Sequence, residues 1–456
     1  MRRRDFLALP VAGAAGKFTE SRGFPSRFVA TGPLDDPEAL PGQLIVAGGR
    51  PGYLKYNGGG PAYLCGPDDP EAFFYLGELA PDGTRRNGPQ EEIINRLAAA
   101  QVSAFHCQIF RMRRCNFKDE GDDSHCPFID HEPSKGLNPR VLDQWDGWLE
   151  KLEKAGIVVH LEFYNDATDV ELMGWKLDAA GNLHPDEYRF ITGIVKRFKH
   201  RKNILWGLEE SANKLPAART PHFKKMAQVI AETDDHHHPI VQSFVVPNDP
   251  ENDFPHGGVL SDVYYWNPHI HVVTWLHLVP HGDDLDMQYW EYHRYWKQDA
   301  PYFIVMKNET YWRDYLPRGP LGRRYLWAGT MAGLHNLEAQ VKADRPAHEP
   351  RMREMGYIAR FMEQTDFHRM KPDRTLAAGS TRWVLANPDS SYIAYTDVYA
   401  KPIGVKGLKP GTFDLLWLDT VDGKSAWQRG VTAPAGGLFE KPAGYSNEVA
   451  VYIKRQ

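Results

Sequence analysis

The sequence predicts an α/β protein in which a (β/α)8 TIM barrel is followed by a small all-β sandwich domain. Short apolar runs rich in β-branched and aromatic residues alternate with stretches of helical periodicity over roughly 300 residues, and about 250 residues plus insertions is typical of such a barrel. After about Thr365 the pattern changes to short alternating segments broken by turn residues, which is typical of an all-β domain. A doubly wound open sheet is the alternative for the first part, but no Gly-x-Gly-x-x-Gly turn follows the first predicted strand.

The predicted strands of the barrel are short apolar runs bounded by polar or turn residues. They span residues 73–76, 104–108, 157–162, 204–207, 240–244, 263–265 and 302–305. Each predicted helix between them carries an apolar stripe at helical spacing. These helices span residues 91–100, 142–155, 185–198, 221–232 and 287–297. The order of strand, helix and strand predicts a parallel sheet whose crossovers are helical.

The barrel is expected over residues 40–365, beginning with a Gly- and Pro-rich hairpin lead-in that contains the apolar piece 44–47. The β-sandwich is expected over residues 370–456, with turns such as Asp422-Gly423 between its strands. Its predicted strands span residues 381–385, 392–395, 413–418 and 449–453. So short a β-rich tail favours one small sandwich.

Residues 1–30 are interpreted as a leader with a twin-arginine export signal. Arg3 and Arg4 precede Phe6 and Leu7, and a short run of small apolar residues follows. The alternative is an ordinary basic terminus, because no clean Ala-x-Ala cleavage site follows the apolar run. We therefore expect a periplasmic or secreted protein, or a cytoplasmic one if the leader does not function.

Composition restricts the partners of this protein. The net charge of -5 argues against a nucleic-acid-binding chain, which would carry a basic excess. No run approaches the roughly 20 apolar residues of a membrane-spanning helix, so we expect no membrane partner. The 13 Trp, 21 Tyr and 21 Phe suit a carbohydrate partner, since flat sugar faces stack on aromatic rings, although many of these rings will fill the core. The oligomeric state is not indicated.

No cofactor is expected. The cysteines match no Cys-x-x-Cys zinc pattern, and buried free thiols are the preferred interpretation over a disulfide. These cysteines are Cys65, Cys107, Cys115 and Cys126.

Carboxylates follow two of the predicted strands. In a (β/α)8 barrel the reacting groups lie at the carboxyl ends of the strands. The acidic pair Glu209 and Glu210 follows the run 204–208, and Glu309 follows the run 302–306. These positions lie about 100 residues apart, which is about three strands in such a barrel. Two carboxylates in one cleft are what glycosidic cleavage requires, because one donates a proton to the leaving oxygen while the other attacks the anomeric carbon or activates water.

These stretches resemble a known group of enzymes. The run 203–211 is similar to the fourth-strand signature of clan A retaining glycoside hydrolases, in which the acid/base Glu follows an Asn, and the run 301–309 resembles the seventh-strand signature, which ends in the nucleophile. The stretches 72–77 and 324–333, with the β-rich tail, are most like the apiosidase-like branch, in which the barrel precedes a sandwich resembling a collagen-binding module. The resemblance covers about residues 44–455. It implies Glu210 as acid/base, Glu309 as nucleophile and a plant-type or other polysaccharide or oligosaccharide as substrate.

The fourth-strand stretch departs from the pattern of these glycosidases. Glu209 occupies the place of the Asn, which in the family binds the sugar 2-hydroxyl, and the segment is one residue shorter than the commonest form. Glu210 is the preferred acid/base, and a one-residue shift to Glu209 is the alternative. An acid at this place affects the expected sugar preference more than the expected reaction.

Further residues are assigned to substrate binding. Trp266, His269 and His271 occupy the place where the sixth strand should end, where they would orient Glu309 or stack on sugar. Other members of the predicted substrate-binding set are Glu209, Arg111, Trp327 and Asn165. Arg111 would hold the nucleophile ionised or form a structural ion pair, and Trp327 would form the floor of a sugar subsite. The run 236–238 (HHH), just before a strand, is interpreted as a solvated loop on the face of the barrel opposite to catalysis.

Two other functions are considered. A metal-dependent hydrolase would use His160, Asp262, His269 and His271, but the first predicted strand lacks the His-x-His of barrel amidohydrolases. A non-catalytic carbohydrate-binding barrel would have lost its activity, against which stands the presence of both Glu210 and Glu309.

Overall fold

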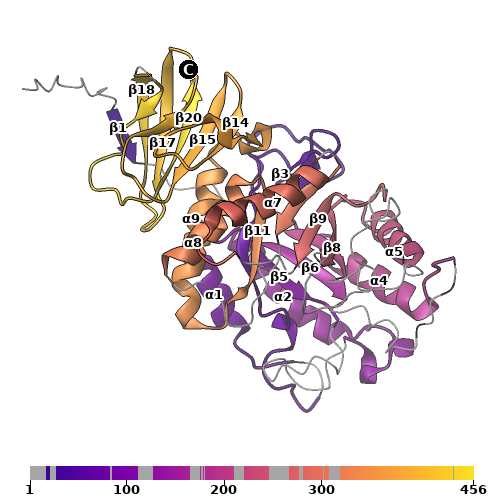
Figure 1. Ribbon diagram of the computed structural model, residues 1–456. Coiled ribbons are helices and arrows are strands. Elements are labelled where there is room, and N and C mark those ends of the chain that lie inside the picture. The colour runs from indigo at the N-terminus through magenta and orange to yellow at the C-terminus, as the bar shows by residue number, and fades with distance from the viewer. Residues whose placement is uncertain are drawn as a thin grey trace, which may run out of the picture. The chain divides into compact units, whose positions relative to one another are not determined.

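A computed structural model describes most of the chain. The described residues are 17–20, 27–82, 85–110, 127–164, 175, 178, 180–209, 220–245, 267–276, 281–300, 302–307, 319–434 and 436–456. They divide into two units (Figure 1), one within residues 24–368 and the other formed by the N-terminal segment up to Gly23 together with Arg369–Gln456.

The larger unit is built on a closed sheet of eight parallel strands. In chain order they are β4 (Cys65–Asp69), β5 (Ala104–Gln108), β6 (Val158–Tyr164), β7 (Ile204–Glu209), β8 (Ile240–Val245), β9 (Val272–Leu276), β10 (Ile304–Lys307) and β11 (His335–Lys342). Each strand from β5 to β10 pairs with the next, and β11 pairs with β4. The ring closes between β4 and β5, where the backbone N–H of Ser103 donates to the carbonyl of Cys65 at 3.0 Å. The predicted (β/α)8 barrel is confirmed.

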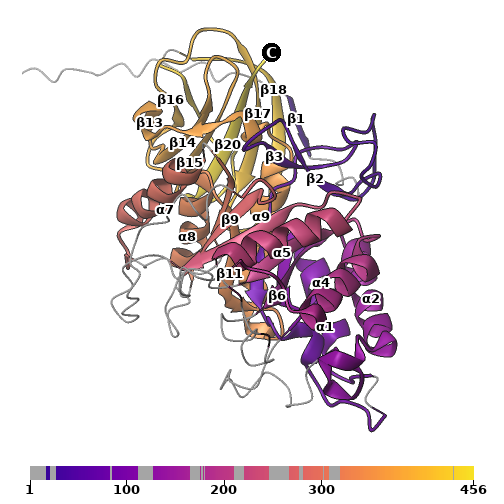
Figure 2. The same cartoon turned by 90° about the vertical axis from the view of Figure 1, so that its right-hand side faces the viewer.

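Helices cover the outside of this ring (Figures 1 and 2). They are α1 (Gln90–Ala100), α2 (Pro139–Lys154), α4 (Pro185–Phe198), α5 (Thr220–Thr233), α7 (Leu285–Asp299), α8 (Pro320–Met331) and α9 (Glu349–Met362). In α2 the residues Leu142, Trp145, Leu149 and Leu152 recur at helical spacing and are buried. The Asn138 side chain caps this helix by accepting from the backbone N–H of Arg140. Local capping and one apolar stripe therefore account for α2.

The interior of the barrel has an apolar lower layer. It is formed by residues at or next to the amino ends of the strands, and the hairpin of β2 (Leu44–Ala47) and β3 (Tyr53–Tyr56) packs against it. The strand residues of this layer include Ala104, Val158, Leu205, Val241, Val272, Ile304 and Leu337. The predicted lead-in hairpin thus closes the amino end of the barrel.

Two positions further along, the interior becomes polar. Side chains on a strand return to the same face every second residue. Two places after the apolar layer, strands β5 to β9 carry His106, His160, Gly207, Ser243 and Thr274, and the polar side chains among them are all buried, whereas β10 carries the apolar Met306. The barrel therefore carries a buried polar layer between its apolar base and the carboxyl ends of its strands.

The first barrel strand is β4 and not the predicted run 73–76. Residues Phe73–Tyr75 form a buried 3-10 helix instead. The sequence of β4, CGPDD, contains Gly and Pro and so has the composition of a turn. It is extended here because β11 supplies hydrogen-bond partners on one side and Ser103, the residue before β5, supplies one on the other.

Three other strand predictions need correction. The sixth strand is β9, whereas the predicted run 263–265 lies outside the described residues. The seventh strand, β10, begins two residues later than predicted. The eighth strand, β11, was not predicted, and most of the run 324–333 belongs to helix α8.

The smaller unit is all-β, as predicted for the C-terminal part of the chain. Its strands are β12 (Lys371–Pro372), β13 (Ala377–Gly379), β14 (Trp383–Asn387), β15 (Ser391–Thr396), β16 (Ile403–Val405), β17 (Thr412–Asp419), β18 (Ser425–Thr432), β19 (Leu438–Phe439) and β20 (Val449–Arg455). They form a larger antiparallel sheet, in the order β1-β18-β17-β20-β15-β14-β12, and a smaller one, β13-β16-β19. Residues of both sheets share one core, in which Ile403 and Phe439 of the small sheet join Trp417 and Val451 of the large one.

One strand of this unit comes from the predicted leader. The segment β1 (Lys17–Glu20) pairs antiparallel with β18 at the edge of the larger sheet. The leader prediction for residues 1–30 therefore overlaps a strand of the β unit, and Arg3, Arg4 and the apolar run lie outside the described residues.

Two predictions from composition, on the cysteines and on membrane-spanning helices, can be compared with the described residues. Cys65 and Cys107 are buried free thiols, as predicted, while Cys115 and Cys126 lie outside the described residues. Burial raises the pKa of the Cys107 thiol to about 12. Among the helices that the structure describes, none combines the length and hydropathy of a membrane-crossing segment.

Closure of the ring between β4 and β5 depends on Gly66. A Cβ atom at this position would lie 1.7 Å from the backbone carbonyl oxygen of Ala104. We predict that Gly66→Ala lowers the free energy of unfolding by about 3 kcal/mol or more, because a backbone atom has little room to yield. The matched control is Gly147→Ala in α2, where a Cβ meets nothing within 4 Å. It should be neutral or stabilise by up to about 1 kcal/mol. Denaturant unfolding of both variants measures the difference, and equal stabilities would contradict this account of closure.

Candidate functional site

The strands that lead to the two predicted catalytic carboxylates are the fourth and the seventh of the ring. Strand β7 ends at Glu209 and strand β10 ends at Lys307. The expected separation of three strands is therefore confirmed for the strands. Glu210 and Glu309 themselves, one and two residues further on, lie outside the described residues, as do Arg111, Asn165 and Trp266.

Glu209 is the last residue of β7 and is fully buried, with 0% of its surface exposed. It lies opposite Tyr164 in the pairing of β7 with β6. Its backbone carbonyl accepts a hydrogen bond of 3.3 Å from Nε2 of Gln242 on β8. The neighbouring strands therefore hold the end of β7 in place, and protein encloses the Glu209 side chain.

Below this end lies a buried network of polar contacts across the barrel. Nδ1 of His106 on β5 lies 2.7 Å from Oδ1 of Asp68 on β4, and Nε2 of His106 lies 3.0 Å from Oε2 of Glu162 on β6. Ser243 of β8 donates from its hydroxyl to Oε1 of Glu162 at 3.1 Å. All four residues are buried. Because both nitrogens of the His106 ring face a carboxylate, the ring suits the doubly protonated imidazolium form.

The protonation states of the residues in this network depend on one another. Burial opposes a charge on His106, but attraction and hydrogen bonding by Asp68 and Glu162 outweigh burial and raise the pKa of His106 well above its usual range. Burial raises the pKa of Asp68 to about 6, against the opposing effect of His106. Burial also raises the pKa of Glu162. For His160, burial and then the charge of His106 lower the pKa well below the ordinary value, so this ring is neutral.

A metal ion suits this cluster less well than a proton does. Potential ligand atoms of His106, His160 and Glu162 lie within 4.8 Å of one another, as do those of Asp68, Glu71 and His106. A metal requires an imidazole nitrogen with a free lone pair. Both nitrogens of His106 instead face carboxylate oxygens, at 2.7 and 3.0 Å, so of the two imidazoles in this cluster only that of His160 offers a lone pair.

Most of this polar network was not predicted from the sequence. His160 was considered only as a metal ligand, and Asp68, His106 and Glu162 were not singled out. A signal was present, because a His in AFHCQ and a His-x-Glu pair in VVHLEFY interrupt otherwise apolar strands at alternate positions. Polar residues that share one face of adjacent parallel strands meet in the barrel interior.

His269 and His271 lie at the opposite end of the barrel from the expected site. The sixth strand begins at Val272, so the segment that was expected to end this strand precedes it. The backbone of His271 bonds to Ile240 and Ile304, the first residues of β8 and β10. The prediction that these histidines orient Glu309 or stack on sugar at the carboxyl ends is therefore wrong. They also lie apart from His160 in the interior, so the structure does not assemble the metal set that was considered.

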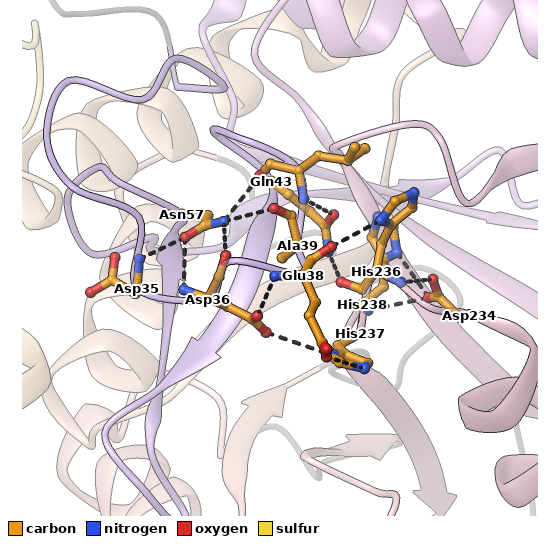
Figure 3. A network of polar contacts seen from close by, with 11 residues as sticks. Asp35, Asp36, Glu38, Ala39, Gln43, Asn57, Asp234, His236, His237 and His238 are labelled. Carbon is orange, nitrogen blue, oxygen red and sulfur yellow. Dashed lines mark hydrogen bonds and ion pairs between the residues drawn. The ribbon is translucent and has the colours of Figure 1, made fainter.

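The run of three histidines directly precedes β8 (Ile240–Val245) and so lies at this same amino-terminal face, as expected. Figure 3 shows its side chains beside those of Glu38 and Asp234. Two of these histidines, His237 and His238, line a cavity of about 260 Å³ together with His269 and His271. His238 is buried, and its two ring nitrogens lie 2.8 Å from Oδ2 of Asp234 and 2.7 Å from the carbonyl of Arg201. The prediction of a solvated loop is thus wrong for His238, which is bonded into the fold. It holds for His237, whose side chain is 49% exposed.

Trp327 is a packing residue of the helical layer. It lies within α8, is 1% exposed, and its ring centroid lies 6.0 Å from that of Phe361 in α9. The run that contains it forms a helix and not a strand end. This placement corrects the expectation that Trp327 forms the floor of a sugar subsite.

No protein-family profile and no curated protein matches the sequence. Solved structures with a similar fold include one named "Glycoside hydrolase", which is 16% identical, with 91% of this chain and 97% of that chain covered at a TM-score of 0.58. A glycoside hydrolase family 5 protein from Bacteroides vulgatus is 14% identical, with 91% and 93% covered at a TM-score of 0.61. The endo-1,4-beta-mannanase from Rhizomucor miehei is 13% identical, with 70% and 100% covered at a TM-score of 0.51. At these identities the likeness shows the fold.

Asp234 provides a pH-dependent contribution to stability at the amino-terminal face. Its Oδ2 accepts from the Trp206 indole at 2.8 Å and faces His238. Burial opposes its charge, but His238 and these hydrogen bonds lower the pKa of Asp234 to about 2. A lowered carboxyl pKa stabilises the fold above the unfolded pKa of about 4, and this stabilisation is lost as the pH falls toward 2.

We predict that Asp234→Asn lowers the free energy of unfolding at pH 7 by about 2 kcal/mol. The gap between this variant and the parent should stay constant from pH 7 to 5 and narrow below pH 4, as denaturant titrations can measure. Asp235→Asn is the matched control, because the Asp235 side chain is 70% exposed and pairs with Lys199 at the surface. Its effect should stay below about 1 kcal/mol. A gap for Asp234→Asn that is unchanged at pH 3 would contradict the assignment.

Proposed function

We propose that this protein is a retaining glycoside hydrolase that cleaves O-glycosidic bonds with Glu210 as acid/base and Glu309 as nucleophile. The proposal rests on the strand order, because β7 is the fourth strand and ends one residue before Glu210, while β10 is the seventh and ends two residues before Glu309. Reacting groups of (β/α)8 enzymes lie at this end of the strands.

The burial of Glu209 supports Glu210 as the acid/base. A general acid must come within hydrogen-bonding distance of the leaving oxygen. Glu209 has no exposed surface, and its backbone is bonded to Gln242. In this assignment Glu209 supports the end of the strand, and Glu210 is the first residue beyond it.

The proposed reaction has two steps. Glu309 attacks the anomeric carbon while protonated Glu210 donates to the departing oxygen, which forms a covalent glycosyl-enzyme. Glu210, now ionised, then takes a proton from water, and that water displaces Glu309 with overall retention of configuration. This mechanism requires one carboxyl to be protonated while the other is ionised, which repulsion between like charges favours in such a pair.

The similar solved structures support the class of substrate. They bear the names of a glycoside hydrolase, a family 5 glycoside hydrolase and an endo-1,4-beta-mannanase. We propose a polysaccharide or oligosaccharide of plant type as the substrate of this chain. Export through the twin-arginine sequence at Arg3 and Arg4 would bring the enzyme to such a substrate outside the cytoplasm.

A screen on aryl glycosides and plant polysaccharides tests the proposal. Glu210→Gln and Glu309→Gln should each lower kcat by about 10² to 10⁴-fold or more, because each removes a group that acts in the transition state. Glu209→Gln should keep kcat within about tenfold of the parent. Glu132→Gln, at a side chain that is 55% exposed, is the control for the amide change itself. Activity that survives both catalytic changes, or that depends on added metal, would refute the assignment.

The stereochemistry of the product tests the retaining mechanism separately. The first sugar released should carry the anomeric configuration of the substrate, as early proton NMR spectra of the reaction record. Azide should restore activity to Glu309→Ala and yield a glycosyl azide of inverted configuration, because the small anion takes the place of the missing nucleophile. A parent enzyme that releases the inverted anomer would exclude the retaining mechanism.

A further inference from the structure

A buried imidazole between two carboxylates is the most unusual feature of the barrel interior, and the proposed reaction does not use it. Asp68, His106 and Glu162 come from three consecutive strands of the closed ring and have at most 1% of their side chains exposed. Charges removed from water cost several kcal/mol each unless they are paired. Perturbed, paired charges that lie near the reacting end of a barrel are candidates for a functional role.

His106 is held on both sides. Its Nε2 is hydrogen-bonded to Glu162 at 3.0 Å, and its Nδ1 lies 2.7 Å from Oδ1 of Asp68 in an ion pair, so a carboxylate flanks the ring on each side. The ring of His160 packs beside it, with centroids 4.5 Å apart and planes inclined by 32°. Among the described residues no hydrogen-bond partner reaches either ring nitrogen of His160. The position of His160 therefore depends on packing against His106 and its neighbours.

His160 and Glu162 in turn lie against strand β7. A Cβ at Gly207 would lie 2.6 Å from Nε2 of His160 and 2.9 Å from Cα of Glu162. Gly207 pairs with Glu162, and Glu209, two residues further, pairs with Tyr164. The backbone of β7 thus lies directly against the two side chains that His106 orients, and the strand ends one residue before Glu210.

We propose that His106 is a positioning residue of the proposed active site, since, as an imidazolium between Asp68 and Glu162, it holds Glu162 and His160 in the arrangement on which the end of strand β7 rests. This inference depends on the proposed glycoside hydrolase function. It assigns to His106 no contact with substrate and no proton transfer in the reaction.

The charges around His106 support this role. The described titratable groups that face it are Asp68 on β4, Glu71 just beyond that strand, and His160 and Glu162 on β6. With His106 charged and His160 neutral, His106 is the cation that compensates the two carboxylates beside it. Replacing His106 by a neutral residue leaves two carboxylates facing the same buried space, where like charges repel.

The protonation state is tested without any reference to activity. In protein with ¹⁵N-labelled histidine, the resonances of His106, assigned by their loss in His106→Gln, should show two protonated ring nitrogens from pH 5 to 8. The His160 resonances, assigned through His160→Gln, should show a neutral ring throughout this range. A His106 ring that is neutral at pH 7, or that titrates near its ordinary pKa, would overturn the proposal.

The positioning role is tested with a charge-matched pair of variants. His106→Gln removes the cation between the two carboxylates, and adding Asp68→Asn removes one of these carboxylates without restoring the imidazolium. We expect His106→Gln to be less stable than the parent and the double variant to recover stability. Both should keep a kcat about 10- to 100-fold below the parent with KM within about threefold, because a small displacement of a catalytic group acts on the reaction step. A kcat equal to that of the parent in either variant would show that His106 positions nothing.

Glu309→Gln in the same kinetic series separates this inference from the proposed function. If Glu309→Gln remains active, the catalytic assignment fails, whatever the His106 spectra show. If Glu309→Gln is inactive while the His106 variants keep the parental kcat, the proposed function stands and the positioning role is refuted.

Discussion

The interior of a closed eight-stranded ring must be filled by its own side chains, and this constraint underlies the rest of the structure. The approach of β4 to β5 at Gly66 closes the ring, and the hairpin of β2 and β3 packs against its apolar base. Above the base the filling is charged, and Asp68, His106 and Glu162 are each acceptable only because the others are present. Apolar packing therefore secures the amino end, and mutual charge compensation secures the layer beneath the carboxyl ends.

The two ends of the barrel use histidine differently. At the amino-terminal face His238 bonds to Asp234 and to the carbonyl of Arg201, which ties the end of α5 to the entry of β8. Both nitrogens are occupied by the fold, so the function of this ring is structural. In the interior His106 is hydrogen-bonded to Glu162 and ion-paired with Asp68, so it lies in the barrel as a buried cation. The same residue type is thus a tether in one place and a buried cation in the other.

Chain position and three-dimensional position agree for the strands that lead to the candidate carboxylates and disagree for the histidines at 269 and 271. The runs before Glu210 and Glu309 are continuous and apolar, so the strands were predictable, although each ends two residues beyond its predicted range. Before β9 the chain also holds aromatic and β-branched residues, and the run 263–265 was taken for the strand itself. Because the predicted strand precedes His269 and His271 while the observed strand β9 follows them, these residues lie at the opposite end of the barrel from the predicted one. Strand ends carry the functional argument in this fold, so boundary errors matter more than errors in the number of elements.

The sequence by itself determined the barrel, its all-β companion and the strands that carry the candidate carboxylates, because periodicity and apolar runs are local properties of the chain. Tertiary structure decided which polar residues meet. Asp68 lies in a segment with the composition of a turn, and its partner Glu162 is far along the chain, so only the registers of β4, β5 and β6 bring them to the two sides of His106. Closure likewise decided that CGPDD is a strand, since its hydrogen-bond partners come from β11 and from the residue before β5. Contacts between residues distant in sequence arise from ring closure and register, which no local pattern encodes.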